Sequence, residues 1–144
     1  YQRILEQQTL IGEMQVNIRY LSCRHYDREK FYKMAEGLEH LKEGGERCLK
    51  CYELRLRESA QIAKKGGFDY FTTTLTISPL KNADRLNEIG KKMEEEYGVT
   101  YLQSDFKKKN GYKRSIELQK NLTCIVRTIV DVNFSGRGPE KKEL

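Results

Sequence analysis

The sequence predicts an α/β protein with an open, mostly parallel sheet and flanking helices. Stretches in which apolar residues recur at helical spacing alternate along the chain with short runs of aromatic and β-branched residues. Two of the helical stretches end at glycines, which stop a helix in the left-handed conformation. At 144 residues the chain has the length of one domain. We expect a single α/β domain over residues 1–120 and a divergent, poorly ordered tail over 121–144.

The first half of the chain contributes two helices and one strand to this prediction. Residues 1–14 have an amphipathic helical pattern that starts inside a helix, so we expect the chain to be a fragment that lacks its natural start. The alternation of apolar and polar residues over 16–21 predicts a half-buried strand. Asp27 is placed to cap a short helix that reaches about Leu38. The glycine-containing stretch 39–47 has no period and predicts a loop.

The second half has the clearest alternation of elements. Residues 49–65 form the most regular helical stripe, and Gly66 and Gly67 follow it. A buried strand is predicted over 68–74, a helix over 83–97 and a short strand over 99–102. Since open parallel sheets place their sites beyond the carboxyl ends of the strands, the loops 22–26, 74–82 and 104–111 are the candidate site.

Charge and composition narrow the class of protein. Lys and Arg number 27 against 21 Asp and Glu, and this net charge of +6 suits a polyanionic partner. No apolar run approaches the roughly 20 residues that span a bilayer, and the first residues lack the layout of a signal peptide. We therefore expect a cytoplasmic protein without a membrane partner. No nucleotide-cofactor fingerprint is present, so reducing equivalents would come from an external donor.

Cys48 and Cys51 form a C-x-x-C pair at the start of a predicted helix, where backbone N–H groups favour thiolates. Such a pair can ligate zinc or an iron–sulfur cluster, or cycle as a dithiol. It supplies only half of a site that usually has about four ligands. The alternative is a pair of structural cysteines on a buried helix face. Cys23 and Cys124 have no paired neighbour to complete the set.

Two further loops carry candidate phosphate-binding residues. Ser78, Lys81 and Asn82 follow a predicted strand and offer a hydroxyl, an ammonium and an amide. The alternative for this segment is an ordinary strand-to-helix turn. Lys107, Lys108 and Tyr112 combine basic and aromatic side chains, a mixture that contacts nucleic-acid backbones and stacks on bases. The alternative there is a solvated basic surface.

Three ordered motifs together resemble the cobalamin-independent epoxyqueuosine reductase family. They are GGERCLKCYELRL at 44–56, GFDYFTTTLTISPLKN at 67–82 and DFKKKNGYKRSIEL at 105–118. The resemblance implies a nucleotide α-hydrolase (PP-loop-like) fold and reduction of the epoxide of epoxyqueuosine to queuosine in the anticodon loop of tRNA. It also implies a [4Fe–4S] cluster, for which Cys48 and Cys51 are two of the four ligands.

The chain departs from the family pattern at both ends. The family's adjacent cysteine pair should precede Tyr1, so the other two cluster ligands are missing from this chain. The tail lacks the family's Cys-Gly-Cys, yet codons exist for Ile129 to Val132 that read Cys-Gly-Cys in a shifted frame. We therefore hypothesise a frameshift near residues 121–123, which the nucleotide sequence would test. The activity of this truncated chain is a separate question from the function of the family.

Two other classes of function remain open at this stage. One is a non-catalytic module that binds tRNA or zinc and uses the cysteine pair structurally. The other is a PP-loop-like nucleotide hydrolase or adenylating enzyme, which the absence of a glycine-rich phosphate loop weakens.

Overall fold

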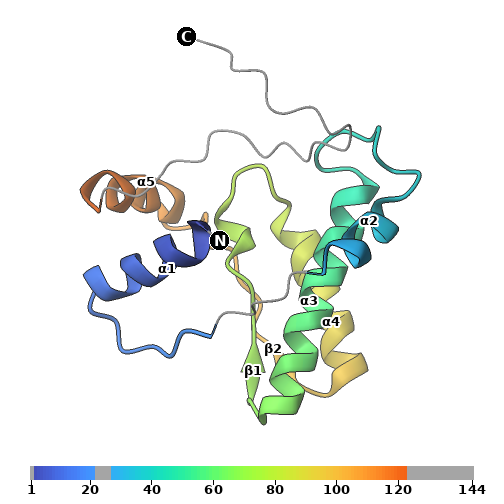
Figure 1. The fold of residues 1–144 in the computed structure, drawn as a ribbon, viewed down its shortest axis with the longest axis horizontal. Coiled ribbons are helices and arrows are strands. Elements are labelled where there is room, and N and C mark those ends of the chain that lie inside the picture. The colour runs from blue at the N-terminus through green and yellow to red at the C-terminus, as the bar shows by residue number, and fades with distance from the viewer. Residues whose placement is uncertain (1, 22–26, 123–144) are drawn as a thin grey trace. The chain divides into compact units, whose positions relative to one another are not determined.

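The computed structural model describes residues 2–21 and 27–122 of the chain (Figure 1). The chain divides into two compact units, one comprising Cys23–Leu118 and the other Tyr1–Ser22 together with Gln119–Leu144. The predictions for the tail from residue 123 onward, including the frameshift, lie outside the described residues. Cys23 and Cys124 also lie outside them.

The smaller unit confirms one prediction and corrects another. Helix α1 (Gln2–Glu13) occupies the predicted amphipathic stretch. The strand predicted over 16–21 is wrong: these residues form no strand, and Ile18 and Leu21 are 59% and 71% exposed. The N–H of Ile18 instead donates to the carbonyl of Val16, which closes a local turn. A strand needs a hydrogen-bonded neighbour, and the two strands within the described residues pair with each other.

The larger unit contains the parallel sheet and the helices that cover it. Its elements in chain order are α2 (Arg28–Ala35), α3 (Glu46–Gly66), β1 (Tyr70–Phe71), η1 (Leu75–Ile77), α4 (Ala83–Tyr97), β2 (Thr100–Tyr101) and the first part of α5 (Gly111–Asn121). The helices predicted over 49–65 and 83–97 are confirmed, and the two strands lie within their predicted ranges but are shorter. Helix α2 begins after its Asp27 cap, as predicted, and ends before Leu38.

The strands β1 and β2 lie side by side and parallel, with Tyr70 opposite Thr100 and Phe71 opposite Tyr101. Helix α4 makes the connection between them (Figure 1). Helices α3 and α4 pack against each other, α3 also contacts β1, and α4 also contacts β2. The class of fold is therefore α/β, with a small open parallel sheet and flanking helices, as predicted.

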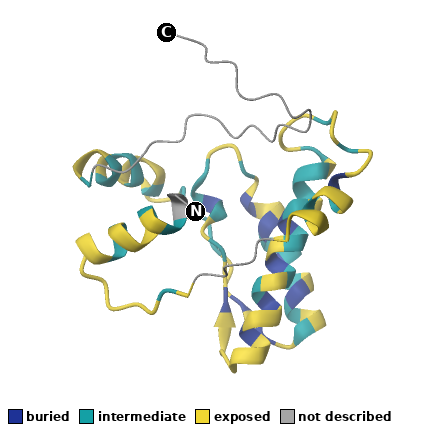
Figure 2. Ribbon diagram, in the orientation of Figure 1, coloured by how far each residue is buried: buried dark blue, intermediate teal, exposed yellow. Residues whose placement is uncertain are grey.

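One face of this sheet is buried and the other is exposed. Phe71 and Tyr101 belong to the core and are 7% and 2% exposed, whereas their neighbour Tyr70 is 57% exposed. The period of two along a strand explains this alternation. Buried and exposed segments alternate along the helices of this unit as well (Figure 2). The buried side chains of α3 and α4 complete the core, which is made up of Tyr52, Leu56, Ala60, Ala63, Phe71, Leu86, Met93, Val99 and Tyr101.

The ends of α3 and α4 follow from their sequence. Gly67 and Gly98 adopt left-handed φ angles of 66° and 71° and donate their N–H groups to the last carbonyls of α3 and α4. At the start of α4, the Asn82 side chain accepts a hydrogen bond from the N–H of Arg85. Because β1 and β2 run parallel, the loops that follow them lie at the same edge of the sheet. Among the described residues, no helix is long and apolar enough to cross a membrane.

Candidate functional site

The cysteine pair lies at the N-terminal end of α3. Gly45 is the N-cap of this helix, so Cys48 falls in its first turn and Cys51 one turn later. Gly44 has a φ of 86°, a left-handed conformation that favours glycine, and its neighbour Gly45 is extended. These two glycines turn the chain sharply into the helix. Both cysteines are free thiols and half-buried.

Each sulfur has a hydrogen-bond donor. The backbone N–H of Gly44 donates to Cys48 Sγ at 3.2 Å, and Arg55 Nε donates to Cys51 Sγ at 3.4 Å. The positive end of the α3 dipole lies at the same place. Donors, a cationic side chain and a helix N-terminus together form surroundings that suit thiolate ligands.

The pKa of Tyr52, the residue after Cys51, is affected by the cysteine pair. Tyr52 follows Cys51 directly in sequence and is 5% exposed in the core. Burial first, then the nearby thiol of Cys48 and the carboxylate of Glu43, raise the pKa of Tyr52 to about 12. Tyr52 belongs to the core, and Cys48 packs against that core.

Two sulfurs are half of a tetrahedral or cluster site. Across residues 2–21 and 27–122, no group of three or more His, Cys, Asp or Glu side chains could hold a metal ion. The pair formed by Cys48 and Cys51 consequently fits two ligand positions, and further ligands must come from elsewhere.

The loop after β1 carries Ser78, Lys81 and Asn82. Ser78 is half-buried and ends η1, its N–H donating to the carbonyl of Leu75. The Asn82 side chain caps α4. Lys81 Nζ lies 3.5 Å from a carboxylate oxygen of Glu43, and the Lys81 side chain is only 17% exposed. This ion pair joins the loop after β1 to the loop that precedes the cysteines.

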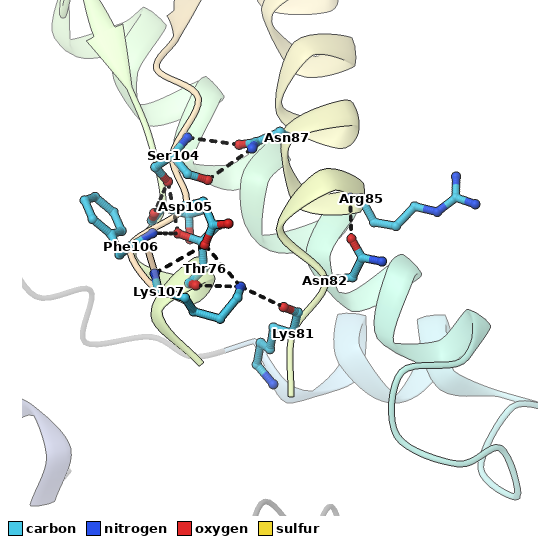
Figure 3. A network of polar contacts seen from close by, with 10 residues as sticks. Thr76, Lys81, Asn82, Arg85, Asn87, Ser104, Asp105, Phe106 and Lys107 are labelled. Atoms are coloured by element: carbon cyan, nitrogen blue, oxygen red, sulfur yellow. Dashed lines mark hydrogen bonds and ion pairs between the residues drawn. The ribbon is translucent and has the colours of Figure 1, made fainter. Parts of the chain in front are cut away.

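In the loop after β2, Lys107 is engaged by other parts of the chain (Figure 3). Lys108 in the same loop and Tyr112 in the first turn of α5 are exposed. Lys107 Nζ donates to the carbonyls of Thr76 and Lys81, at 2.9 Å and 3.2 Å, and lies 3.3 Å from the Asp105 carboxylate. Tyr112 is 42% exposed. The structure thus gives Lys107 a set of internal partners and leaves Lys108 and Tyr112 facing solvent.

A polar network that the sequence reading missed holds the two loops together. Thr76 is fully buried, and its hydroxyl shares a hydrogen bond of 3.1 Å with that of Ser104 and accepts one from the N–H of Phe106. The Asn87 side chain accepts from the N–H of Ser104 at 3.1 Å and donates to its carbonyl at 3.0 Å (Figure 3).

The helical pattern of α4 contains one sign of this network, the polar residue Asn87. Asn87 lies one turn after buried Ala83 and next to buried Leu86, so helical spacing places it at the margin of the core. A polar side chain at such a position must find partners. Which partners it finds depends on loops that the helical pattern does not describe.

The backbone between β2 and α5 is tightly turned. Lys109 and Asn110 both have left-handed φ angles, 53° and 61°. A β-carbon at the next residue, Gly111, would overlap the carbonyl of Phe106. This turn brings the chain into α5 at Gly111.

The fold and the site define a class of α/β proteins with a C-x-x-C pair at a helix N-terminus, beside loops that follow parallel strands. A family model described as "Epoxyqueuosine reductase QueH" matches residues 1–127. The chain belongs to this family, which confirms the resemblance seen in its motifs.

Named relatives agree with the family match. A protein from Staphylococcus epidermidis called "Epoxyqueuosine reductase QueH" is 46% identical over 104 residues, covering 71% of this chain and 43% of the relative. A protein of the same name from Streptococcus pyogenes is 46% identical over 101 residues, covering 70% of this chain and 39% of the relative. A third protein of this name, from Thermotoga maritima, is 36% identical over 107 residues, covering 74% of this chain and 56% of the relative. The chain spans about half the length of these curated relatives or less.

Proposed function

We propose that this chain is part of an epoxyqueuosine reductase, an oxidoreductase that reduces the epoxide of epoxyqueuosine in tRNA to queuosine. The observation that carries the proposal is the placement of Cys48 and Cys51, inside a family match over residues 1–127, at a helix N-terminus with a donor on each sulfur. The relatives' name supports the reaction. It does not favour the alternative of a non-catalytic tRNA- or zinc-binding module.

The cofactor of this proposal is a [4Fe–4S] cluster, of which Cys48 and Cys51 would hold one side. Such a cluster, when bound, supplies electrons one at a time. Reduction of an epoxide consumes both electrons and protons, so an external electron donor is part of the proposal. The N–H of Gly44 and the side chain of Arg55 would orient the two sulfurs on this side of the cluster. The partial burial of both cysteines would shield the sulfurs from water.

The tRNA would lie along the loops after β1 and β2, with its anticodon loop toward the cysteines. The proposed contacts are Ser78, Lys81, Asn82, Lys107, Lys108 and Tyr112. Support is strongest for Lys108 and Tyr112, because both are exposed and combine a cation with an aromatic ring. Phosphate contacts would supply affinity and the unpaired bases specificity. The PP-loop-like architecture belongs to this proposal as well, and a tRNA substrate implies a cytoplasmic location.

Iron counting after anaerobic reconstitution tests the proposal. We would reconstitute this chain, and a version fused upstream to a segment with an adjacent cysteine pair, with iron and sulfide. The fused version should hold about four irons per chain with thiolate-to-iron absorbance. Cys48→Ser and Cys51→Ser should each lose most of this iron, because a missing ligand opens the site.

Cys124→Ser is the matched control, since it removes a thiol of the tail and should keep the iron of its parent. A full iron complement in Cys48→Ser or Cys51→Ser would refute the ligand assignment. Binding of zinc but no iron by both versions would favour the non-catalytic module.

A further inference from the structure

A chain of polar contacts runs from the loop after β2 to the sulfur of Cys48. Lys107 holds the carbonyl of Lys81 at 3.2 Å, and the ammonium of Lys81 pairs with Glu43 at 3.5 Å. Glu43 is bonded directly to Gly44, whose N–H reaches Cys48 Sγ at 3.2 Å. Three segments that are far apart in sequence are thereby joined in front of the cysteine pair.

The peptide between Glu43 and Gly44 is the critical unit of this chain. The N–H that faces Cys48 belongs to the same planar group as the carbonyl of Glu43, so the two move together. A β-carbon at Gly44 would meet no atom within 4 Å, and Gly44 is exposed. Packing therefore does not hold this peptide. A hydrogen bond from the N–H of Gly45 to the carbonyl of Lys42 closes a turn around it, and the side chain of Glu43 ties that turn to Lys81.

The ammonium of Lys81 is engaged within the protein, which gives Lys81 a role beyond the proposed tRNA contact. Its side chain is 17% exposed and its ammonium faces the carboxylate of Glu43. A phosphate would have to displace that carboxylate, whereas Lys108 is exposed to solvent. Lys107 is similarly engaged, with two carbonyls and a carboxylate around its ammonium.

We propose that Lys81 and Lys107 are positioning residues that act through Glu43 to hold the Gly44 N–H against the sulfur of Cys48. The loops after β1 and β2 would in this way set the geometry of the cysteine pair. The consequence for metal binding rests on the proposed function, but the placement of the Gly44 amide does not. Loss of the Lys81–Glu43 ion pair, or of the hydrogen bond from Lys107 to the carbonyl of Lys81, should therefore weaken the hydrogen bond from the Gly44 N–H to Cys48 Sγ.

Nuclear magnetic resonance of the 144-residue chain labelled with ¹⁵N-glycine tests this proposal without any metal. Only the 11 glycine amides are then visible, and Gly44→Ala identifies the signal of Gly44. In Lys81→Met we expect the Gly44 amide to exchange with water about two- to tenfold faster, the range that loss of one ordinary hydrogen bond supports. Lys107→Met should give a smaller increase, because it acts one contact further away.

Lys50→Met is the matched control. It removes one positive charge near the N-terminal end of α3 by breaking the exposed Lys50–Glu46 ion pair, which lies within α3 and joins no loop. It should leave the exchange rate of Gly44 at the wild-type value. The double exchange Glu43→Lys with Lys81→Glu restores an ion pair of opposite polarity and should recover part of the protection.

Equal Gly44 exchange in wild type, Lys81→Met and Lys50→Met would overturn the proposal. If Lys81→Met loses its helical circular dichroism, Glu43→Gln decides, because it leaves the backbone contacts of Lys81 intact; an unchanged Gly44 signal in that folded variant would also overturn it. Failure of iron binding in the reconstitution experiment would refute the proposed cofactor and leave this result standing.

Discussion

The core between α3, α4 and the sheet is held together differently from the loops at the carboxyl ends of β1 and β2. In the core, apolar side chains such as Leu56, Leu86 and Met93 are at most 1% exposed and pack without specific partners. In the loops, Thr76, Ser104 and Lys107 are held by hydrogen bonds to named oxygen and nitrogen atoms. The hydrophobic effect is roughly proportional to buried area and has no preferred direction. A hydrogen bond, in contrast, depends on the distance and the angle between its donor and its acceptor.

This difference separates stability from site geometry. A change in the core should lower the free energy of unfolding and leave the arrangement of the site intact while the chain stays folded. A change in the loop network should cost less stability but move the residues around the cysteines. Three substitutions, taken from the largest expected effect to the smallest, test this division.

Gly90→Ala should be the most destabilising of the three. Gly90 is buried on α4, and a β-carbon there would overlap the ring of Tyr101, itself 2% exposed. Overpacking of a closed core costs up to about 3 kcal/mol, and the overlap with the Tyr101 ring places this variant at the upper end. Urea unfolding followed by circular dichroism should show this loss. The control is Gly12→Ala in α1, where nothing lies within 4 Å of the new methyl group, and no loss is expected. Similar losses in both variants would contradict the close contact.

Thr76→Val should cost about 2 kcal/mol and disturb the loops. The substitution keeps the shape of the buried side chain but leaves the N–H of Phe106 without its acceptor and the Ser104 hydroxyl without one partner. The chemical shifts of residues in the loop after β2 should change more than those of the core. Thr76→Ser keeps the hydroxyl and should retain the loop shifts. A Thr76→Val variant as stable as wild type would show that the network contributes little.

Asn82→Ala should have the smallest effect, a loss of about 1 kcal/mol from removal of the α4 cap. Asn82→Ser restores a capping oxygen and should recover most of this loss in the same urea experiment. If Asn82→Ala and Asn82→Ser lose equal stability, the cap is not the reason for the loss. If phosphate or tRNA affinity falls in Asn82→Ala with no loss of stability, direct binding by Asn82 is favoured instead.

Prediction from sequence succeeded where a local pattern carries the structure. The apolar stripe and Gly98 defined α4 over its full length, because helical spacing and a left-handed stop are properties of consecutive residues. The same reading failed over residues 16–21, where the alternation of a strand is present but no strand in 2–21 or 27–122 pairs with it. An alternating pattern shows that a segment can form a strand, but the strand forms only when a neighbouring strand supplies its backbone hydrogen bonds.

For this protein, the sequence by itself determined the α/β class, the two main helices with their ends, the family, and the place of Cys48 and Cys51 at a helix start. The tertiary structure decided that Lys107 contacts Thr76, a hydrogen bond across 31 positions, and that Lys81 pairs with Glu43. The physical reason is that helix pattern and capping involve neighbours within a few residues, whereas the partners of a lysine in a loop are chosen by how distant segments pack.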